Sequence, residues 1–208
     1  MRTTVALALV LAAGCSDASS ESVDPGPPPT GRLCEAEAPP ESLAWKRVDA
    51  FIADLQRGLE LDGAEFCQEL GRQDFPCATV HRVPLGGNDP IFLAQYEPVR
   101  SPLSTTAVAV ERVALIACQN AVARDATTRR VFADLPPSER VLGEGDVEAV
   151  REQTSALYRR LLGRDPTGDE LGVIASLGAD DTGAPRSVRD FDTLSCLAIA
   201  TTTENLLY

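Results

Sequence analysis

The sequence predicts a mainly α-helical protein, an irregular bundle of about five to six helices with a long loop, after a disordered N-terminal tether. Three observations support this prediction. Apolar residues recur at helical spacing from about residue 44 onward, proline and glycine cluster between those stretches, and residues 16–42 are polar and rich in proline. We therefore expect residues 41–208 to form a single α-helical domain, which is long enough to bury a substantial core.

The first fourteen residues have the composition of a secretory signal peptide. Arg2 is their only charged residue, and an uninterrupted small and apolar run extends from Thr3 to Gly14. That run is shorter than the ~20 residues that a membrane-spanning helix needs. A short basic start followed by a short apolar run and small residues is typical of export signals. Residues 1–14 are therefore predicted to direct export.

The string "LAAGC", which ends at Cys15, resembles the lipobox of bacterial lipoproteins. The resemblance implies that the Cys15 thiol takes a diacylglyceryl group and that the chain is cleaved before it. It also implies the outer membrane, facing the periplasm or the cell surface, because Ser16 stands where aspartate is the usual inner-membrane retention signal. The alternative is an ordinary secretory signal with an accidental cysteine.

Residues 15–40 are expected to be the lipidated, flexible tether. Ser, Asp, Glu, Pro and Gly dominate this segment, so it cannot bury enough apolar surface to offset its ordering entropy. The run "PGPPP" stiffens it locally toward polyproline II. The tether would hold the helical domain away from the membrane.

The first half of the domain is predicted to contain two helices and a long connection. Apolar spacing from Ala44 to Leu59 indicates an amphipathic helix capped by Ser42. The string "DGAEFCQELG" indicates a short second helix that stops at Gly71. Residues 72–103 contain five prolines, which favour an irregular connection with at most a short strand around Ile91 to Leu93.

The second half is predicted to be more regular. The segment "STTAVAVERVALIACQNAVARD" is apolar nearly all round a helix, which indicates a central, buried one, with Ser104 or Thr105 as its cap. A second helix, capped by Asp146 and stopped by Gly163, is expected to bury one face. That face carries Val147, Val150, Leu157, Tyr158 and Leu161.

Two further helices complete the expected bundle. Thr167 and Glu170 match a capping box, with threonine at the N-cap and glutamate three residues later. The helix that they start should end near Gly178. The string "RDFDTLSCLAIATTTENLLY" is then predicted to form one last helix that runs to the terminus.

The charge balance excludes some partners. The formal net charge is −12, which disfavours nucleic acid, because phosphates demand basic contacts. It also disfavours a loose electrostatic attachment to anionic lipid. We therefore expect no nucleic acid as a partner. The lipid anchor and the tether instead predict membrane attachment through Cys15 and an envelope protein as partner.

The cysteines predict a disulfide-braced exported domain. If Cys15 carries lipid, five cysteines remain, so at most two bridges form within the chain and one thiol is left over. Sequence alone cannot choose the pairing. We favour Cys67 with Cys77, which flank the turn-like "GRQDFP", and Cys118 with Cys196, which lie on two apolar helices expected to pack together. Cys34 is then the unpaired candidate.

No complete catalytic or metal-binding motif is evident, so we expect no cofactor and no metal. The chain has no C-x-x-C, no C-x-x-C-H haem motif and no G-x-S-x-G. His81 is the only histidine, and no acid or nucleophile stands beside it in the sequence. The only catalytic candidates are therefore weak ones, His81 and Asp89 of the long loop. Gly86-Gly87 favours a turn over an anion-binding nest, and the acidic strings "DDTG" and "DPTGDE" lack the spacing of a calcium loop.

The C-terminal sixty or so residues resemble a group of uncharacterised exported bacterial families that often carry, or are encoded with, c-type cytochrome domains. The matching pattern is an aromatic–x–Arg–x–Leu, an Arg–x–Pro–Thr–x–x–Glu, and a last helix ending in Glu, an apolar pair and Tyr. The matching residues are Tyr158, Arg160, Leu162, Arg164, Pro166, Thr167, Glu170, Glu204, Leu206, Leu207 and Tyr208. The resemblance implies a helical architecture, export, and a partner in an envelope redox or polymer-handling system.

The sequence thus favours a non-enzymatic outer-membrane lipoprotein whose tethered helical domain binds a partner protein. A first alternative is an accessory subunit of an envelope redox enzyme, or an enzyme with a site in the 72–103 loop around His81 and Asp89. Long irregular connections inside compact domains are often functional, which motivates that alternative. A second alternative is a small-ligand or calcium-binding module.

Overall fold

This computed structural model describes residues 44–69, 72, 75–99 and 101–207. Within them the protein is mainly helical, as the sequence predicted. Five α-helices have nine or more residues and three have four. In chain order they are α1 (Val48–Leu59), α2 (Gly63–Phe66), α3 (Cys77–Val80), α4 (Thr106–Thr128), α5 (Val147–Leu161), α6 (Gly168–Ser176), α7 (Val188–Ala200) and α8 (Thr203–Leu206), with the 3₁₀ helix η2 (Glu144–Asp146) before α5. The signal peptide, Cys15, the tether and Cys34 lie outside the described residues.

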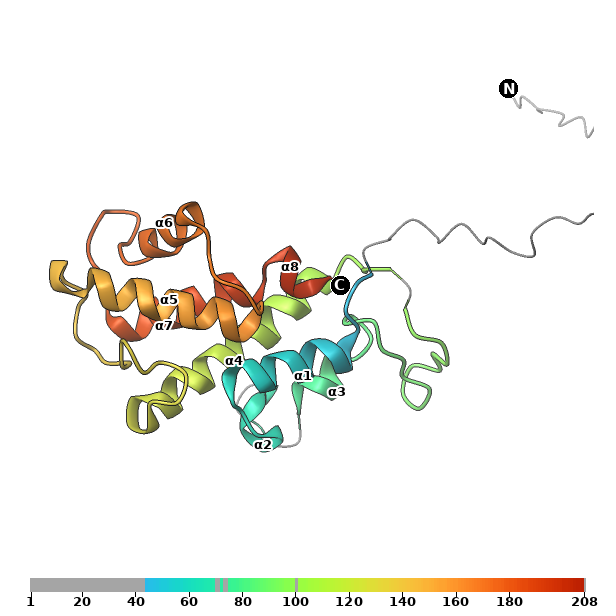
Figure 1. The fold of residues 1–208 in the computed structure, drawn as a ribbon. Helices are drawn as coiled ribbons and strands as arrows, with labels where there is room; N and C mark the ends of the chain where they lie inside the picture. The colour runs from blue at the N-terminus through green and yellow to red at the C-terminus, as the bar shows by residue number, and fades with distance from the viewer. Residues whose placement is uncertain (1–43, 70–71, 73–74, 100, 208) are drawn as a thin grey trace, which may run out of the picture. The chain divides into compact units, whose positions relative to one another are not determined.

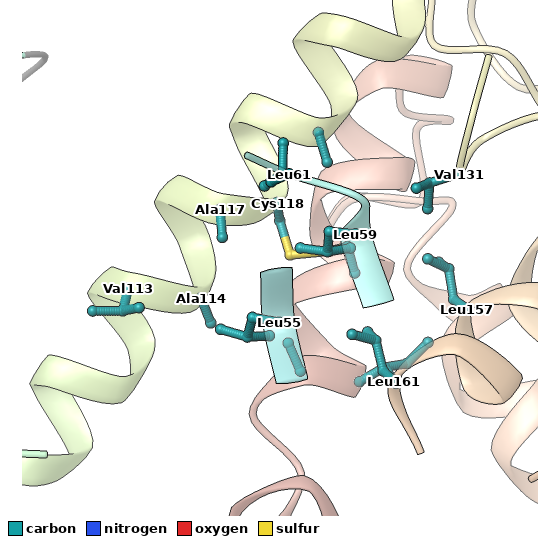
Figure 2. Packing of buried hydrophobic residues seen from close by; sticks show 14 of the residues in the cluster. Leu55, Leu59, Leu61, Val113, Ala114, Ala117, Cys118, Val131, Leu157 and Leu161 are labelled. Carbon is teal, nitrogen blue, oxygen red and sulfur yellow. A yellow bond between two sulfur atoms is a disulfide. The ribbon is translucent and has the colours of Figure 1, made fainter. Parts of the chain in front are cut away.

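Helix α4 runs through the domain and packs against α7 and α1, and α5 packs in turn against α1 and α7 (Figure 1). Figure 2 shows the core where these helices meet, with Leu55, Leu59, Ala114, Ala117 and Leu157 pointing toward one another. The small side chains of α4 allow its neighbours to approach closely. The helix is long and apolar enough to cross a membrane, but half of its most apolar stretch is buried inside the domain. It serves here as the central core helix that the sequence predicted.

Two disulfides brace the domain, and they join the pairs that the sequence favoured. Cys118 of α4 is bonded to Cys196 of α7, with 5.8 Å between their Cα atoms. Cys67 is bonded to Cys77, with 5.4 Å between their Cα atoms. The first bridge lies in the core and fastens two long helices, and the second closes a ten-residue loop between α2 and α3.

The start of the domain differs from the prediction. Helix α1 begins at Val48 rather than near Ser42, because the preceding residues are paired with the other end of the chain. Trp45 forms an antiparallel bridge with Leu207, and the Lys46 N–H donates to the carbonyl of Leu206 at 2.8 Å. This pairing requires extended backbone, so the helix cannot start earlier.

Helix α2 is shorter than predicted, and the connection that follows it is more ordered than predicted. Helix α2 ends at Phe66, because Cys67 is extended and its carbonyl accepts the N–H of Cys77 at 3.1 Å. The connection then contains the short helix α3. Residues 91–93 form a turn and not a strand. Asp89 and Gln95 make an isolated antiparallel bridge around this turn.

The predicted caps of α4 and α5 do not form as expected. Thr105 precedes α4 without capping it, whereas the hydroxyl of Thr106 accepts the Leu103 N–H at 2.8 Å. Asp146 precedes α5, but its carboxylate accepts the N–H of Gly143 at 2.8 Å and binds Arg140.

Val147 does not belong to the core face that the periodicity of α5 suggested. Its side chain is 70% exposed at the first residue of the helix. Leu157, Tyr158 and Leu161 of the same face are buried, and Val150 packs against the core only in part. In the first turn of α5, Ala149 and Val150 therefore pack partly against the core and Val147 does not.

The C-terminal segment confirms one prediction and corrects another. Thr167 and Glu170 form the predicted capping box, with the Thr167 N–H donating to the Glu170 carboxylate at 2.7 Å. The predicted single last helix is wrong, because α7 ends at Ala200 and α8 starts afresh at Thr203. The buried Asn205 side chain donates to the carbonyl of Ala200 at 2.7 Å, which satisfies the end of α7 and fixes the break.

Candidate functional site

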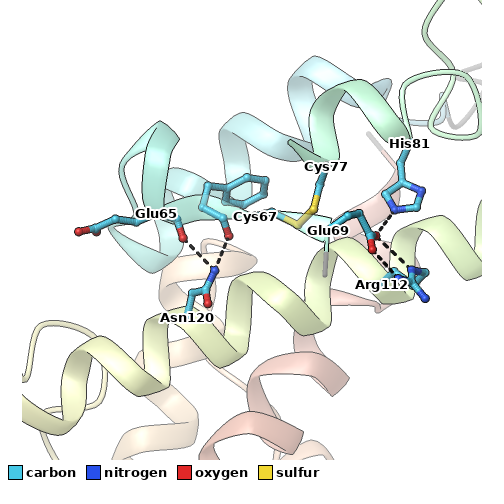
Figure 3. Close-up of a disulfide and its surroundings, with 8 residues drawn as sticks. Glu65, Cys67, Glu69, Cys77, His81, Arg112 and Asn120 are labelled. Carbon is cyan, nitrogen blue, oxygen red and sulfur yellow. Dashed lines mark hydrogen bonds and ion pairs between the residues drawn. A yellow bond between two sulfur atoms is a disulfide. The ribbon is translucent and has the colours of Figure 1, made fainter. Parts of the chain in front are cut away.

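His81, the only histidine, is held in a charged cluster beside the Cys67–Cys77 disulfide (Figure 3). Its Nε2 atom contacts a carboxylate oxygen of Glu69, which follows Cys67 closely in the chain. Arg112 of α4 binds the same carboxylate with two nitrogens, the Nε–Oε1 distance being 3.1 Å. The disulfide loop is therefore fastened to α4 through Glu69.

The electrostatics of this cluster indicate a structural role. The bond from Arg112, together with the contact with His81, lowers the pKa of Glu69 to about 2 against the opposing effect of burial. Both oxygens of the Glu69 carboxylate are engaged, one by Arg112 and His81 and the other by Arg112. The pocket beside the cluster is small, about 290 Å³, and Cys67 and Cys77 are bonded to each other and offer no thiolate.

The structure does not bring His81 and Asp89 together as bonding partners. Among the described residues, the Asp89 carboxylate accepts the N–H of Phe92 at 2.9 Å, inside its own loop. The acid that His81 contacts is Glu69, which was not among the candidates predicted from the sequence. The one available signal was its position two residues after a cysteine of the favoured disulfide.

The loop around Asp89 carries the most exposed cluster of large apolar side chains in the described part of the chain. We call residues 88–97 the knuckle. The exposed fractions of its side chains are 83% for Ile91, 81% for Phe92, 63% for Leu93 and 74% for Tyr96. Soluble proteins rarely expose several neighbouring large apolar side chains unless that surface binds a partner, a ligand or a membrane.

An apolar groove of about 650 Å³ lies at the end of the domain where the described chain begins. Figure 1 shows α8, the first turns of α4 and the start of the described chain meeting at that end. The groove is lined by the chain around Trp45, the start of α4, the end of α7 and α8. Its main apolar residues are Trp45, Leu103, Val110, Leu177, Leu194, Leu197, Leu206 and Leu207.

Only a few polar groups interrupt the groove. Glu111, Thr201 and Thr203 line it, whereas the hydroxyl of Thr106 is engaged with the carbonyl of Pro84 at 2.6 Å. A second apolar hollow of about 600 Å³ lies between η2, α5 and α6, next to the exposed Val147. Both hollows suit apolar groups, but only the first adjoins the start of the described chain.

Five of the residues that carry the C-terminal resemblance, Tyr158, Arg164, Thr167, Glu170 and Glu204, converge in space. The Arg164 guanidinium binds the carboxylates of Glu170 and Glu204, at 2.6 Å each, and lies 5.3 Å from the centre of the Tyr158 ring. The bond from Arg164, together with the Thr167 N–H, lowers the pKa of Glu170 to about 2. This network ties the α5–α6 turn to α8. Its charges satisfy one another, so the pattern has a structural explanation.

The acidic loops show no metal site among the described residues. The Asp180 carboxylate accepts the N–H groups of Thr182 and Ala184, both at 2.9 Å, which makes it a turn-forming residue. Glu170 is engaged with Arg164 and Thr167. No group of three His, Cys, Asp or Glu side chains comes together in this part of the chain. The calcium alternative therefore has no arrangement to support it here.

No protein-family model, no curated protein and no solved structure matches this chain. Its function must therefore be inferred from its own residues and their geometry.

Proposed function

We propose that this protein is an outer-membrane lipoprotein, anchored through acyl chains on Cys15, whose helical domain binds an envelope protein partner in the apolar groove. The observation that carries the proposal is the groove itself, about 650 Å³ of space with a mainly apolar lining. A groove between helices suits an apolar helical or extended segment of a partner.

The disulfides support the exported location in this proposal. Protein disulfides persist in oxidising compartments and are rare where thiols are kept reduced. The domain contains two, and one of them lies in the core between α4 and α7. A domain built around such a bridge is suited to the bacterial envelope.

The position of the groove supports the link between anchor and partner. Trp45 lines the groove and is the second residue of the described chain, so the proposed tether is joined in sequence to a residue that lines the groove. A partner held there would lie close to the membrane to which Cys15 is proposed to be attached. The C-terminal resemblance makes a c-type cytochrome the first partner to test.

The groove proposal predicts a site-specific cross-link in cells. A photoreactive amino acid at Ala107, which is exposed and lines the groove, should form one defined adduct with an envelope protein. Leu103→Glu should reduce that adduct about tenfold or more, because the partner would have to desolvate a carboxylate. Val173→Glu, at an exposed position outside the groove, is the matched control and should leave the adduct unchanged. Either no adduct, or an adduct that survives Leu103→Glu, would contradict the proposal.

The anchor proposal makes a separate prediction. Cells fed labelled palmitate should incorporate the label into the wild-type chain and not into Cys15→Ala, because only that thiol is proposed to carry lipid. Cys34→Ala is the control and should retain the label. Label in Cys15→Ala, or none in the wild type, would show that the chain is not a lipoprotein anchored there.

A second candidate function is binding of a small apolar ligand in the same groove. Its volume falls within the ~300–1,000 Å³ typical of small-molecule sites, with few polar groups to orient a ligand. Native mass spectrometry of protein purified from the envelope distinguishes the two candidates. A bound lipid or other small molecule that Leu103→Glu displaces would favour the ligand, and its absence would favour the protein partner.

A further inference from the structure

The knuckle, residues 88–97, exposes its apolar side chains in a fixed arrangement. The backbone groups of Asp89 and Gln95 exchange two hydrogen bonds of 3.0 Å, which close the loop. Inside it, the Phe92 N–H donates to the Asp89 carboxylate at 2.9 Å, and the Leu93 N–H to the Asp89 carbonyl at 3.3 Å. The apolar tip is thus held outward by bonds at its base.

These internal bonds suit the knuckle to an apolar environment. Backbone N–H groups that enter a membrane without partners carry a large free-energy cost. Here the N–H groups of Phe92, Leu93 and Gln95 are all bonded within the loop. Ile91, Phe92 and Leu93 are adjacent at the tip, and Tyr96 has the amphipathic ring that favours the boundary between lipid and water.

The charges around the knuckle favour an uncharged lipid surface. Arg82 donates to the Asn88 carbonyl at 3.0 Å but also pairs with Asp49, and no lysine or arginine follows it up to Val99, whereas Asp89 and Glu97 lie at the base of the knuckle. The whole chain is strongly acidic. Binding would therefore rest on apolar insertion, and anionic headgroups would oppose it.

The knuckle lies near Trp45, at the start of the described chain. The Trp45 ring packs against Gly86 so closely that an added Cβ would be 2.8 Å from it, and the knuckle begins two residues later. About 30 residues separate Cys15 from that point. A flexible chain of that length has a root-mean-square span of about 30 Å. An anchored domain would therefore meet the membrane at a high effective concentration.

We propose that the knuckle is a second, reversible membrane contact, in which Ile91, Phe92 and Leu93 insert into the lipid interface and Tyr96 lies at the headgroups. This inference rests on the proposed lipid anchor, which brings the membrane within reach. The contact would orient the domain so that the end bearing the groove faces the bilayer.

The test uses the mature chain from residue 15 with Cys15→Ser, so that no acyl chain contributes. We expect it to float with vesicles of phosphatidylcholine and phosphatidylethanolamine, with little dependence on salt. Ile91→Ser with Phe92→Ser should reduce the bound fraction about tenfold, because the inserted apolar surface is lost. Val147→Ser with Val173→Ser removes two other exposed apolar groups and should have no effect. Unchanged urea midpoints would show that both variants fold.

Two outcomes would overturn the inference: a parent chain that does not float, or a knuckle variant that floats equally well. A photoreactive residue at Phe92 in cells separates lipid from protein contacts. It should label lipid, and a protein adduct without vesicle binding would assign the knuckle to a protein partner instead. Failure of the anchor would appear independently, as absence of palmitate from the wild-type chain.

Discussion

Replacing both Cys118 and Cys196 with alanine is expected to lower the free energy of unfolding by about 4–5 kcal/mol. The bridge joins residues 78 apart in the sequence, so its loss releases a long loop in the unfolded chain. A domain of this size typically has only about 5–15 kcal/mol of stability in total. The variant should therefore be only marginally folded at growth temperature.

The other bridge provides the matched control. Cys67 and Cys77 are ten residues apart, so their replacement by alanine should cost less, about 2.5–3 kcal/mol. Urea unfolding of the two double variants and the parent, all carrying Cys34→Ser to prevent thiol exchange, measures both effects. Equal losses from the two pairs would contradict the loop-length argument. A negligible loss from Cys118 and Cys196 would show that α4 and α7 pack without the bridge.

The features predicted correctly from the sequence are those that depend on local pattern. The apolar spacing of α1, α4 and α5 predicted helices, and Thr167 with Glu170 predicted a cap, because each of these depends on residues within one or two turns. The favoured disulfides followed from two helices expected to be core and from one short loop. Apart from the long-range Cys118–Cys196 bridge, neighbouring residues contain the physical cause.

The features that escaped prediction depend on contacts between distant residues. Helix α1 starts late because Trp45 pairs with Leu207 at the opposite end of the chain. His81 contacts Glu69 because the disulfide and Arg112 place that acid beside it. The break before α8 depends on the Asn205 side chain reaching Ala200. Periodicity contains none of this information.

The candidate site escaped prediction for a related reason. Residues 72–103 were singled out because a long irregular connection is unusual, which directed attention to His81 and Asp89. The sequence does not show that Ile91 to Leu93 face solvent, since three apolar residues in a row suit a buried strand equally well. The groove needed the start of α4, the end of α7 and α8 to be placed together.

Asp192 of α7 is the most unusual ionisable group in the described domain. Its side chain is fully buried, and neither carboxylate oxygen has a hydrogen-bond partner among the described residues. Burial raises the pKa of Asp192 to about 8, with a further contribution from the negative charge of Asp125. Burial also disfavours ionised Asp125, but the N–H groups of Phe132 and Val131 and the Arg124 guanidinium keep the pKa of Asp125 below its ordinary value. Asp192 is therefore protonated in the folded protein at neutral pH.

This protonation predicts that Asp192 makes the domain less stable as the pH rises. Between the ordinary aspartate pKa of about 4 and the folded value of about 8, the native state holds a proton that the unfolded chain has released. The free energy of unfolding should then fall by up to about 1.4 kcal/mol per pH unit over that range, and stop falling above it. Asp192→Asn removes the ionisable group, so its advantage over the wild type should grow from pH 5 to pH 8.

Urea unfolding at pH 5, 6.5 and 8 measures this difference. Asp190→Asn, an exposed position on the same helix, is the control and should leave the pH dependence as it is. The comparison is made in a His81→Gln background, which removes the only imidazole of the chain. Glu69 does not add to the pH dependence of stability between pH 5 and pH 8. Its pKa is lowered to about 2, so the stability that its ionised form contributes is already fully present near pH 5. A wild-type and Asp192→Asn pair with parallel pH profiles would show that Asp192 is ionised in the folded domain, and hence that it has a partner or access to solvent.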